Sequence, residues 1–123
     1  MFINFTNHLS AKWSQAQLKA AEEYGEILDF PFPNVNPNGN EQYIEELAEE
    51  FAEKIIAHNP AAVLCQGEMT LSFAVTKILT EKYNVKVLAA CSERIVSEEI
   101  GLNGETVRKI EFGFVRFRRY FSG

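Results

Sequence analysis

Four short apolar runs, separated by segments with helical periodicity, limit the possible fold of this chain more than any other feature. The runs cover residues 1–5, 26–32, 61–66 and 85–91, and the helical segments cover residues 13–24, 41–58 and 69–83. The later runs show no alternation between apolar and polar residues, which is typical of strands covered on both faces. Strands and helices in alternation predict a parallel sheet with helices on its faces.

The alternation of strand-like and helix-like segments ends at residue 91. Residues 92–121 show no good helical pattern, and Asn103-Gly104 is a signal for a two-residue hairpin turn. We therefore expect an antiparallel extension whose final strand is rich in Phe, Val and Arg. At 123 residues the chain is long enough for one core and too short for two. The sequence thus predicts a single α/β domain over residues 1–123, with a central, mostly parallel sheet, flanking helices and a C-terminal antiparallel hairpin.

Composition and charge narrow the possible functions. The net charge of −5 argues against the broad positive field that polymeric DNA or RNA requires, although a few local donors can still hold a small anion. No segment has the length of a membrane span, and the start lacks the pattern of a secretory leader. Cys65 and Cys91 close apolar runs, which favours buried free thiols over a zinc site. We expect a cytoplasmic protein without a metal or cofactor.

Polar residues follow three of the predicted strands. Ligands of an open parallel sheet bind outside the carboxyl ends of its strands, where the strand order reverses. With the first and third strands adjacent at the centre, these residues should meet at one edge of the sheet. They are Thr6, Asn7, His8 and Ser10 after the first strand, Gln66, Gly67, Glu68 and Thr70 after the third, and Ser92, Glu93 and Arg94 after the fourth.

The chemistry of these residues suits a nucleotide. The neutral hydrogen-bonding side chains match base edges, ribose hydroxyls and phosphate oxygens. Gly67 permits close approach of the backbone, and the helix that follows it offers free N–H groups to an anion. Arg94 is a planar phosphate ligand. The imidazole of His8 is the side chain here that exchanges protons near neutral pH.

Each of these residues also has a purely structural interpretation. Thr, Asn and Ser are ordinary turn and cap residues. His8 can be a partly buried imidazole with satisfied hydrogen bonds, and Trp13 can anchor the core instead of stacking on a base. Glu68 can be a base or a helix-start carboxylate, and Glu93 and Arg94 can pair with each other or with the hairpin. The residues by themselves predict an α/β domain with a polar site.

Several segments resemble small CRISPR-associated proteins. "INFTNHLSAKW" resembles the opening of a family in which the first strand ends in Arg-His-Pro-Gly-Ala, followed shortly by Trp. "FPFPNVNP", "VLCQGEMTLSFAV" and "AACSERIVSE" resemble blocks of a stand-alone family found near type III CRISPR loci. The resemblance covers the chain up to about residue 99 and implies a Rossmann-like fold related to the CARF domain, which senses cyclic oligoadenylate.

The resemblance implies a ring nuclease. Such enzymes are typically homodimers that bind cyclic tetra-adenylate across their two-fold axis. They linearise it without a metal, by attack of a ribose 2′-hydroxyl on its own 3′-phosphodiester. At the matching positions, Asn7, His8 and Ser10 would lie by the scissile phosphate. Residues 66–68 would form the floor and residues 92–94 the wall, with Thr6, Trp13 and Thr70 completing the binding set. Leu9 stands where the related segment has Pro, so the turn departs from the family's.

Two other functions remain open at this point. A non-catalytic sensor or sponge would bind the ring and keep it intact, using the same kinds of residue. A protein-interaction module would dock a partner through the Phe-rich final strand and the segment Arg116-Phe117-Arg118-Arg119, with the polar clusters serving only as turns and caps.

Overall fold

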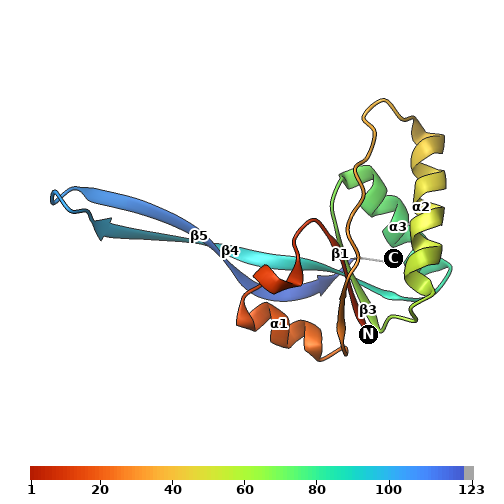
Figure 1. Ribbon diagram of the computed structural model, residues 1–123, viewed down its shortest axis with the longest axis horizontal. Coiled ribbons are helices and arrows are strands. Elements are labelled where there is room, and N and C mark those ends of the chain that lie inside the picture. The colour runs from red at the N-terminus through yellow and green to blue at the C-terminus, as the bar shows by residue number, and fades with distance from the viewer. Residues whose placement is uncertain (121–123) are drawn as a thin grey trace.

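The structure, a computed structural model, describes residues 1–120 and has a five-stranded sheet with helices on both faces (Figure 1). The strands lie in the order β2-β1-β3-β4-β5, and all neighbours are parallel except the antiparallel pair β4-β5. This is the predicted mixed α/β, Rossmann-like fold with a C-terminal hairpin. The elements are β1 (Phe2–Thr6), η1 (Ser10–Lys12), α1 (Gln15–Glu22), β2 (Ile27–Asp29), α2 (Glu41–Ile56), β3 (Ala62–Gln66), α3 (Met69–Glu81), β4 (Lys86–Ile100) and β5 (Thr106–Arg119).

The two faces of the sheet bury different cores. Because successive side chains of a strand point to opposite faces, Ile3 and Phe5 of β1 pack on one side and Phe2 on the other. Ile3 and Phe5 belong to a large core with residues of α2 and α3, including Ile55 and Leu79. Phe2 belongs to a smaller core that α1 covers through Ala21, the one fully buried residue of that helix. The predicted three layers are therefore present, but they are unequal.

The helix that covers the smaller core is short. Ser14 is its N-cap residue, and the hydroxyl oxygen of Ser14 accepts a hydrogen bond from the backbone N–H of Gln17 at 3.2 Å. Gly25 follows the helix with φ of +120°, a conformation that suits glycine. The helix itself spans only Gln15–Glu22, and Trp13, predicted as its first residue, lies before it. A helix of eight residues covers only part of its face of the sheet.

The C-terminal hairpin differs from the prediction in two ways. The fourth strand does not end at Cys91. It stops pairing with β3 at Leu88 but continues to Ile100, because its pairing with β5 persists over that length. The predicted two-residue turn at Asn103-Gly104 is also wrong. Ile100 pairs with Thr106, which leaves residues 101–105 as the loop, and of the two turn residues only Gly104 has a positive φ.

The hairpin projects from the body as a two-stranded ribbon, here called the arm and defined as residues 92–114 (Figure 1). At its base the register of the ladder shifts: Cys91 pairs with Arg116 and Ser92 with Phe114, so Val115 is an extra, unpaired residue. Such a bulge bends the strand and strengthens its twist. Through it, Phe114 and Phe117 come to lie with ring centroids 4.9 Å apart.

The remaining sequence predictions concern the thiols and the helices. Both cysteines are free, but only Cys65 is buried, and burial raises the pKa of its thiol to about 11. Cys91 is half-buried, so the prediction of two buried thiols holds for Cys65 alone. None of the helices within residues 1–120 combines the length and the apolar run that crossing a membrane would require.

Candidate functional site

A cavity of about 690 Å³ lies on the α1 face of the sheet, at the carboxyl ends of β1 and β3 and beside the middle of β4. The strand order reverses between β1 and β3, so this is the place where an open parallel sheet binds ligands. The sheet supplies the floor, the segment from η1 into α1 one wall, and the base of the arm the other wall. The lining residues are Thr6, Asn7, His8, Lys12, Trp13, Ser14, Gln17, Leu64, Gln66, Gly67, Ala90, Ser92, Phe112, Gly113 and Phe114.

The charge of the cavity differs from that of the whole chain. The chain carries 17 acidic residues and a net charge of −5, yet none of the described residues that line the cavity is acidic. Lys12 is the cation of the lining, and His8 is its titratable ring. The aromatic rings of Trp13, Phe112 and Phe114 also line it. This combination suits an anionic guest that carries aromatic groups.

A buried network fixes the loop that follows β1 from below. Asn4, only 1% exposed, donates from Nδ2 to the backbone oxygen of His8 and to Oδ1 of Asp29, both at 2.8 Å. Its Oδ1 accepts a hydrogen bond from the hydroxyl of Thr6 at 2.8 Å. The same hydroxyl oxygen accepts from the backbone N–H of His8 at 3.1 Å. The backbone of His8 is therefore held at both its N–H and its C=O.

Asp29 extends this network to Ser10. Its two carboxylate oxygens accept hydrogen bonds from the backbone N–H of Ser10 at 3.1 Å and from its hydroxyl at 2.9 Å. Burial acts to raise the pKa of Asp29, but the hydrogen bonds from Asn4 and Ser10 outweigh it, and the net result is a lowered pKa. Ser10, predicted to lie by the scissile phosphate, thus bonds Asp29 and does not line the cavity.

Asn7 and His8 form a second, outer layer above this network. Both residues are exposed and both line the cavity. Their side chains take part in none of the hydrogen bonds within residues 1–120, in contrast to those of Asn4 and Thr6 beneath them. An anchored backbone with unengaged polar side chains suits a binding loop, because the backbone that carries these side chains is fixed before a ligand arrives.

The position of Trp13 is compatible with both interpretations considered for it. Its ring packs edge-on against Phe2 with centroids 6.2 Å apart and lies 6.5 Å from the ring of Phe117. It also lines the cavity. The same side chain therefore anchors the smaller core and presents an aromatic surface to a guest.

Gln66 and Gly67 line the cavity, but each also has a structural task. The Oε1 atom of Gln66 accepts a hydrogen bond from the backbone N–H of Ala90 at 2.8 Å, which bridges β3 and β4 beyond their last paired residues. A Cβ on Gly67 would lie 2.6 Å from ring atoms of Phe32, so the glycine makes room for that ring. The backbone N–H of Gly67 donates to the hydroxyl of Ser72 at 3.0 Å.

Glu68 and Thr70 lie outside the cavity and bond each other at the start of α3. The carboxylate of Glu68 accepts from the backbone N–H groups of Thr70 at 2.8 Å and Leu71 at 3.1 Å. The Thr70 hydroxyl, followed by these backbone N–H groups, lowers the pKa of Glu68. The helix-start interpretation of Glu68 therefore describes its contacts. The N–H groups that were expected to receive a ligand anion are occupied by this carboxylate.

Of the residues predicted after the fourth strand, Ser92 lines the cavity, while Glu93 and Arg94 are exposed on the arm beyond it. Glu93 and Arg94 are consecutive residues of β4 and therefore point to opposite faces of the ribbon. Within residues 1–120 neither takes part in an ion pair, so the predicted pairing between them is absent there.

Sequence reasoning missed several residues of the site. Lys12, Ser14 and Gln17 line the cavity from η1 and α1, and Phe112 and Phe114 line it from the arm. Asn4 and Asp29 hold the loop above them. A signal for Asn4 exists in the sequence, since it is a polar residue in the middle of the apolar run "FINF". Within residues 1–120 no group of three or more His, Cys, Asp or Glu side chains is arranged to hold a metal ion.

Comparison with known proteins places the chain in a family. No curated protein and no solved structure matches it. The sequence model of a family described as "Uncharacterized protein MJ1673 family" matches residues 1–118, which is nearly the whole chain. The chain is therefore a member of the MJ1673 family of uncharacterized proteins.

Proposed function

We propose that this protein is a ring nuclease of the cytoplasm that binds a cyclic oligoadenylate, in the first instance cyclic tetra-adenylate, and opens the ring without a metal. In this role it would switch off type III CRISPR signalling. The observation that carries the proposal is the cavity at the carboxyl ends of β1 and β3. Among residues 1–120 its lining includes no acid and combines one ammonium, one imidazole and three aromatic rings, in a chain with a net charge of −5. The sequence resemblance to CRISPR-associated proteins supplies the substrate class.

The cavity offers a partner for each part of an oligoadenylate. The rings of Trp13, Phe112 and Phe114 can stack on adenine bases, a contact worth about 1–3 kcal/mol per base. The ammonium of Lys12 lies in the lining and is assigned to a phosphate. The neutral side chains of the lining, including that of Asn7, match base edges and ribose hydroxyls. Arg94 lies outside the cavity and has no part in this binding scheme.

The proposed reaction is an internal transfer. The ribose 2′-oxygen attacks the adjacent phosphorus and loses its proton, the bond from phosphorus to the 5′-oxygen breaks, and that oxygen takes up a proton. The products are a 2′,3′-cyclic phosphate and a free 5′-hydroxyl on a linear chain. The protein must align the three reacting atoms and stabilise the developing negative charge. We assign proton transfer to the imidazole of His8 and charge stabilisation to Lys12 and the amide of Asn7.

The size of the cavity is relevant to the oligomer. About 690 Å³ falls within the range of roughly 300–1,000 Å³ that is usual for the site of one small ligand. A ring of four nucleotides exceeds a site of that size. Two cavities related by a two-fold axis would match the symmetry of the ring, which agrees with the homodimer that the sequence resemblance implies.

The test is incubation of the purified protein with cyclic tetra-adenylate in the presence of EDTA, with the products separated by liquid chromatography and identified by mass. We expect linear products that end in a 2′,3′-cyclic phosphate. An intact ring after a long incubation with excess protein contradicts the nuclease proposal. In that case calorimetry decides the second candidate, a non-catalytic sponge, which the same stacking and hydrogen-bonding lining favours. Tight binding of an unbroken ring would establish the sponge.

A further inference from the structure

Beyond its base, the arm is exposed on both faces. Every residue of its two strands from Ser92 to Ile100 and from Thr106 to Phe112 is exposed. At about 3.4 Å per residue, the nine paired residues from Ser92 to Ile100 extend roughly 27 Å. A two-stranded hairpin without a covered face is marginally stable in water at best. An arm of this length therefore needs a covering surface.

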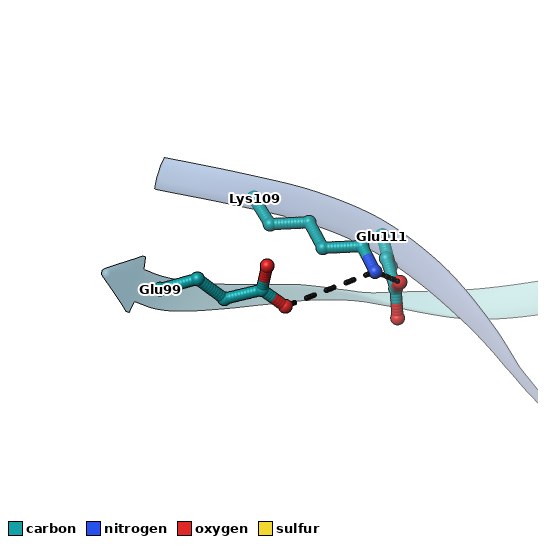
Figure 2. A network of polar contacts seen from close by, with 3 residues as sticks. All are labelled: Glu99, Lys109 and Glu111. Atoms are coloured by element: carbon teal, nitrogen blue, oxygen red, sulfur yellow. Dashed lines mark ion pairs between the residues drawn. The ribbon is translucent and has the colours of Figure 1, made fainter. Parts of the chain in front are cut away.

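The two faces of the arm differ in their share of large apolar side chains. One face carries the charged cluster in which the ammonium of Lys109 lies 2.9 Å from a carboxylate oxygen of Glu111 and 4.0 Å from one of Glu99 (Figure 2). The other face continues the cavity side of the sheet, because it includes Ser92 and Phe114. It carries most of the large exposed apolar side chains. This cavity-side face consists of the cross-strand pairs Ser92–Phe114, Arg94–Phe112, Val96–Ile110, Glu98–Arg108 and Ile100–Thr106.

The order of these pairs is self-complementary. The central pair, Val96–Ile110, is apolar, and the residues on either side of it differ in charge. On β4 a cation, Arg94, stands two residues before the centre and an anion, Glu98, two residues after it. On β5 the aromatic ring of Phe112, 74% exposed, stands on the side of Arg94, and the cation Arg108 stands on the side of Glu98. When a second copy of this face is laid over it in the opposite direction, each Arg94 meets a Glu98 and each Phe112 meets an Arg108.

We propose that the cavity-side face of the arm binds the same face of a second copy of this chain. The two arms run antiparallel, with the two-fold axis between their Val96–Ile110 pairs. Arg94 then faces Glu98 of the partner subunit, and Phe112 faces Arg108 of the partner subunit, a cation–π pair. An isologous contact of this kind buries the apolar centre and satisfies the charges around it.

This pairing completes the cavity. Ser92 lies four residues before Val96 and Ile100 lies four residues after it. In the antiparallel arrangement Ile100 of the partner subunit therefore faces Ser92 in the cavity wall. The partner subunit's Leu102, fully exposed in the single chain, then reaches the mouth of the cavity. Each cavity is thus closed by the tip of the other subunit's arm. The inference rests on the arm alone and holds whether or not the guest of the cavity is a cyclic oligoadenylate.

The first test is the mass of the protein in solution, measured by light scattering over a range of concentrations, with a matched pair of variants. Val96→Lys places a charge in the proposed interface, whereas Ile95→Lys places the same charge on the opposite face. The two positions are 45% and 43% exposed, so their effects on folding should be similar. We expect a dimer for the native chain and for Ile95→Lys. For Val96→Lys we expect a dimer dissociation constant at least 100-fold higher, with an unchanged circular dichroism spectrum. A monomeric native chain, or equal weakening by both variants, overturns the proposal.

A charge exchange tests the antiparallel arrangement. Arg94→Glu sets two carboxylates against each other and should weaken the dimer. Adding Glu98→Arg restores opposite charges across the axis, so the double variant should recover most of the native affinity. If the arms ran parallel, the second change would set two cations together. A double variant weaker than Arg94→Glu would therefore exclude the antiparallel arrangement.

Trp13 reports closure of the cavity without any nucleotide. It is the single tryptophan of the chain and lines the cavity, so quenching of its fluorescence by acrylamide measures access to that site. We expect quenching to be weaker in the native dimer and in Ile95→Lys than in Val96→Lys. Leu102→Ser should raise quenching while the dimer persists. Equal quenching in the native dimer and the Val96→Lys monomer would show that the arm tip does not cover the cavity.

Discussion

The two faces of the sheet differ in how completely helices cover them. On the face covered by α2 and α3, the ring of Phe5 lies within 4.6 Å of that of Phe32 and 5.6 Å of that of Phe51, centroid to centroid. On the other face the short helix α1 leaves the carboxyl ends of the strands uncovered, and polar groups occupy that space. The difference teaches that the cavity is the part of the core that α1 is too short to fill.

We therefore expect changes on the α2–α3 face to alter the free energy of unfolding. Changes at exposed residues of the cavity should alter only binding and turnover. The largest effect should come from the imidazole. His8→Ala should lower the rate of ring opening by ~10²–10⁴-fold, the usual contribution of a positioned acid or base. Stability should stay unchanged, because the side chain of His8 is exposed.

The control is His58→Ala. That ring is exposed on the other side of the sheet, edge-on to Phe30 at 6.2 Å, and its loss should leave the rate intact. Single-turnover rates of both variants, beside the native chain, make the comparison. Equal rates for His8→Ala and the native protein would remove His8 from the mechanism.

The second comparison replaces, in separate variants, a phenylalanine of the α2–α3 face and one of the cavity wall. Phe5→Ala removes a fully buried ring and should cost about 3–5 kcal/mol of unfolding free energy. Phe112→Ala removes an exposed ring of the cavity wall and should change monomer stability by about 0.5 kcal/mol or less. The affinity of Phe112→Ala for cyclic tetra-adenylate should fall by about 1–3 kcal/mol if the ring stacks on a base. Urea denaturation and calorimetry measure the two effects, and unchanged affinity would remove Phe112 from the site.

The third comparison sets the two layers of the loop against each other. Asn4→Ala removes the buried amide that donates to the backbone oxygen of His8 and to the carboxylate of Asp29, which should cost about 1–3 kcal/mol. Asn7→Ala changes an exposed side chain and should stay within about 0.5 kcal/mol of the native value. Urea denaturation of both variants decides the matter. An equal loss of stability would show that the loop is not anchored from below.

The smallest effect concerns pH. The pKa of Asp29 is lowered in the folded state, so its carboxylate stabilises the protein at pH values above the unfolded pKa of about 3.9. That stabilisation is lost as the pH falls through the lowered folded pKa. The native chain should therefore lose more stability between about pH 5 and pH 3 than Asp29→Asn does. Glu26→Gln, a change on an exposed neighbouring residue, should follow the native curve. Identical curves for the native chain and Asp29→Asn would contradict this role.

The order of strands and helices could be predicted from the sequence because local periodicity determines it. Placing β1 beside β3 then brought the polar strand ends together, and Thr6, Asn7, His8, Gln66, Gly67 and Ser92 do line one cavity. The tasks of single side chains could not be predicted in this way. Whether Glu68 faces a ligand or its own helix depends on its rotamer, and the glycine at position 67 is required by Phe32, thirty-five residues earlier.

The arm was harder to predict because the sequence pattern is interrupted. Phe112 and Phe114 are two residues apart, as alternation on one face requires, whereas Phe117 follows at an odd spacing. In a regular strand Phe114 and Phe117 would point to opposite faces. The extra residue Val115 brings both to the cavity side, and the odd spacing alone does not show whether a bulge or a change of face causes it.

That bulge has a geometric consequence for an assembly of two subunits. An unpaired residue sets the direction in which a strand leaves its sheet. Val115 lies at the junction between the sheet of the body and the arm, so it sets the angle between the arm and the body. In a pair joined through the ribbons, that angle determines how far apart the two guest sites stand. Deleting Val115 would keep Phe114 and Phe117 on one side of the strand, yet it would alter the direction in which the arm leaves the body and hence the distance between the two cavities of the dimer.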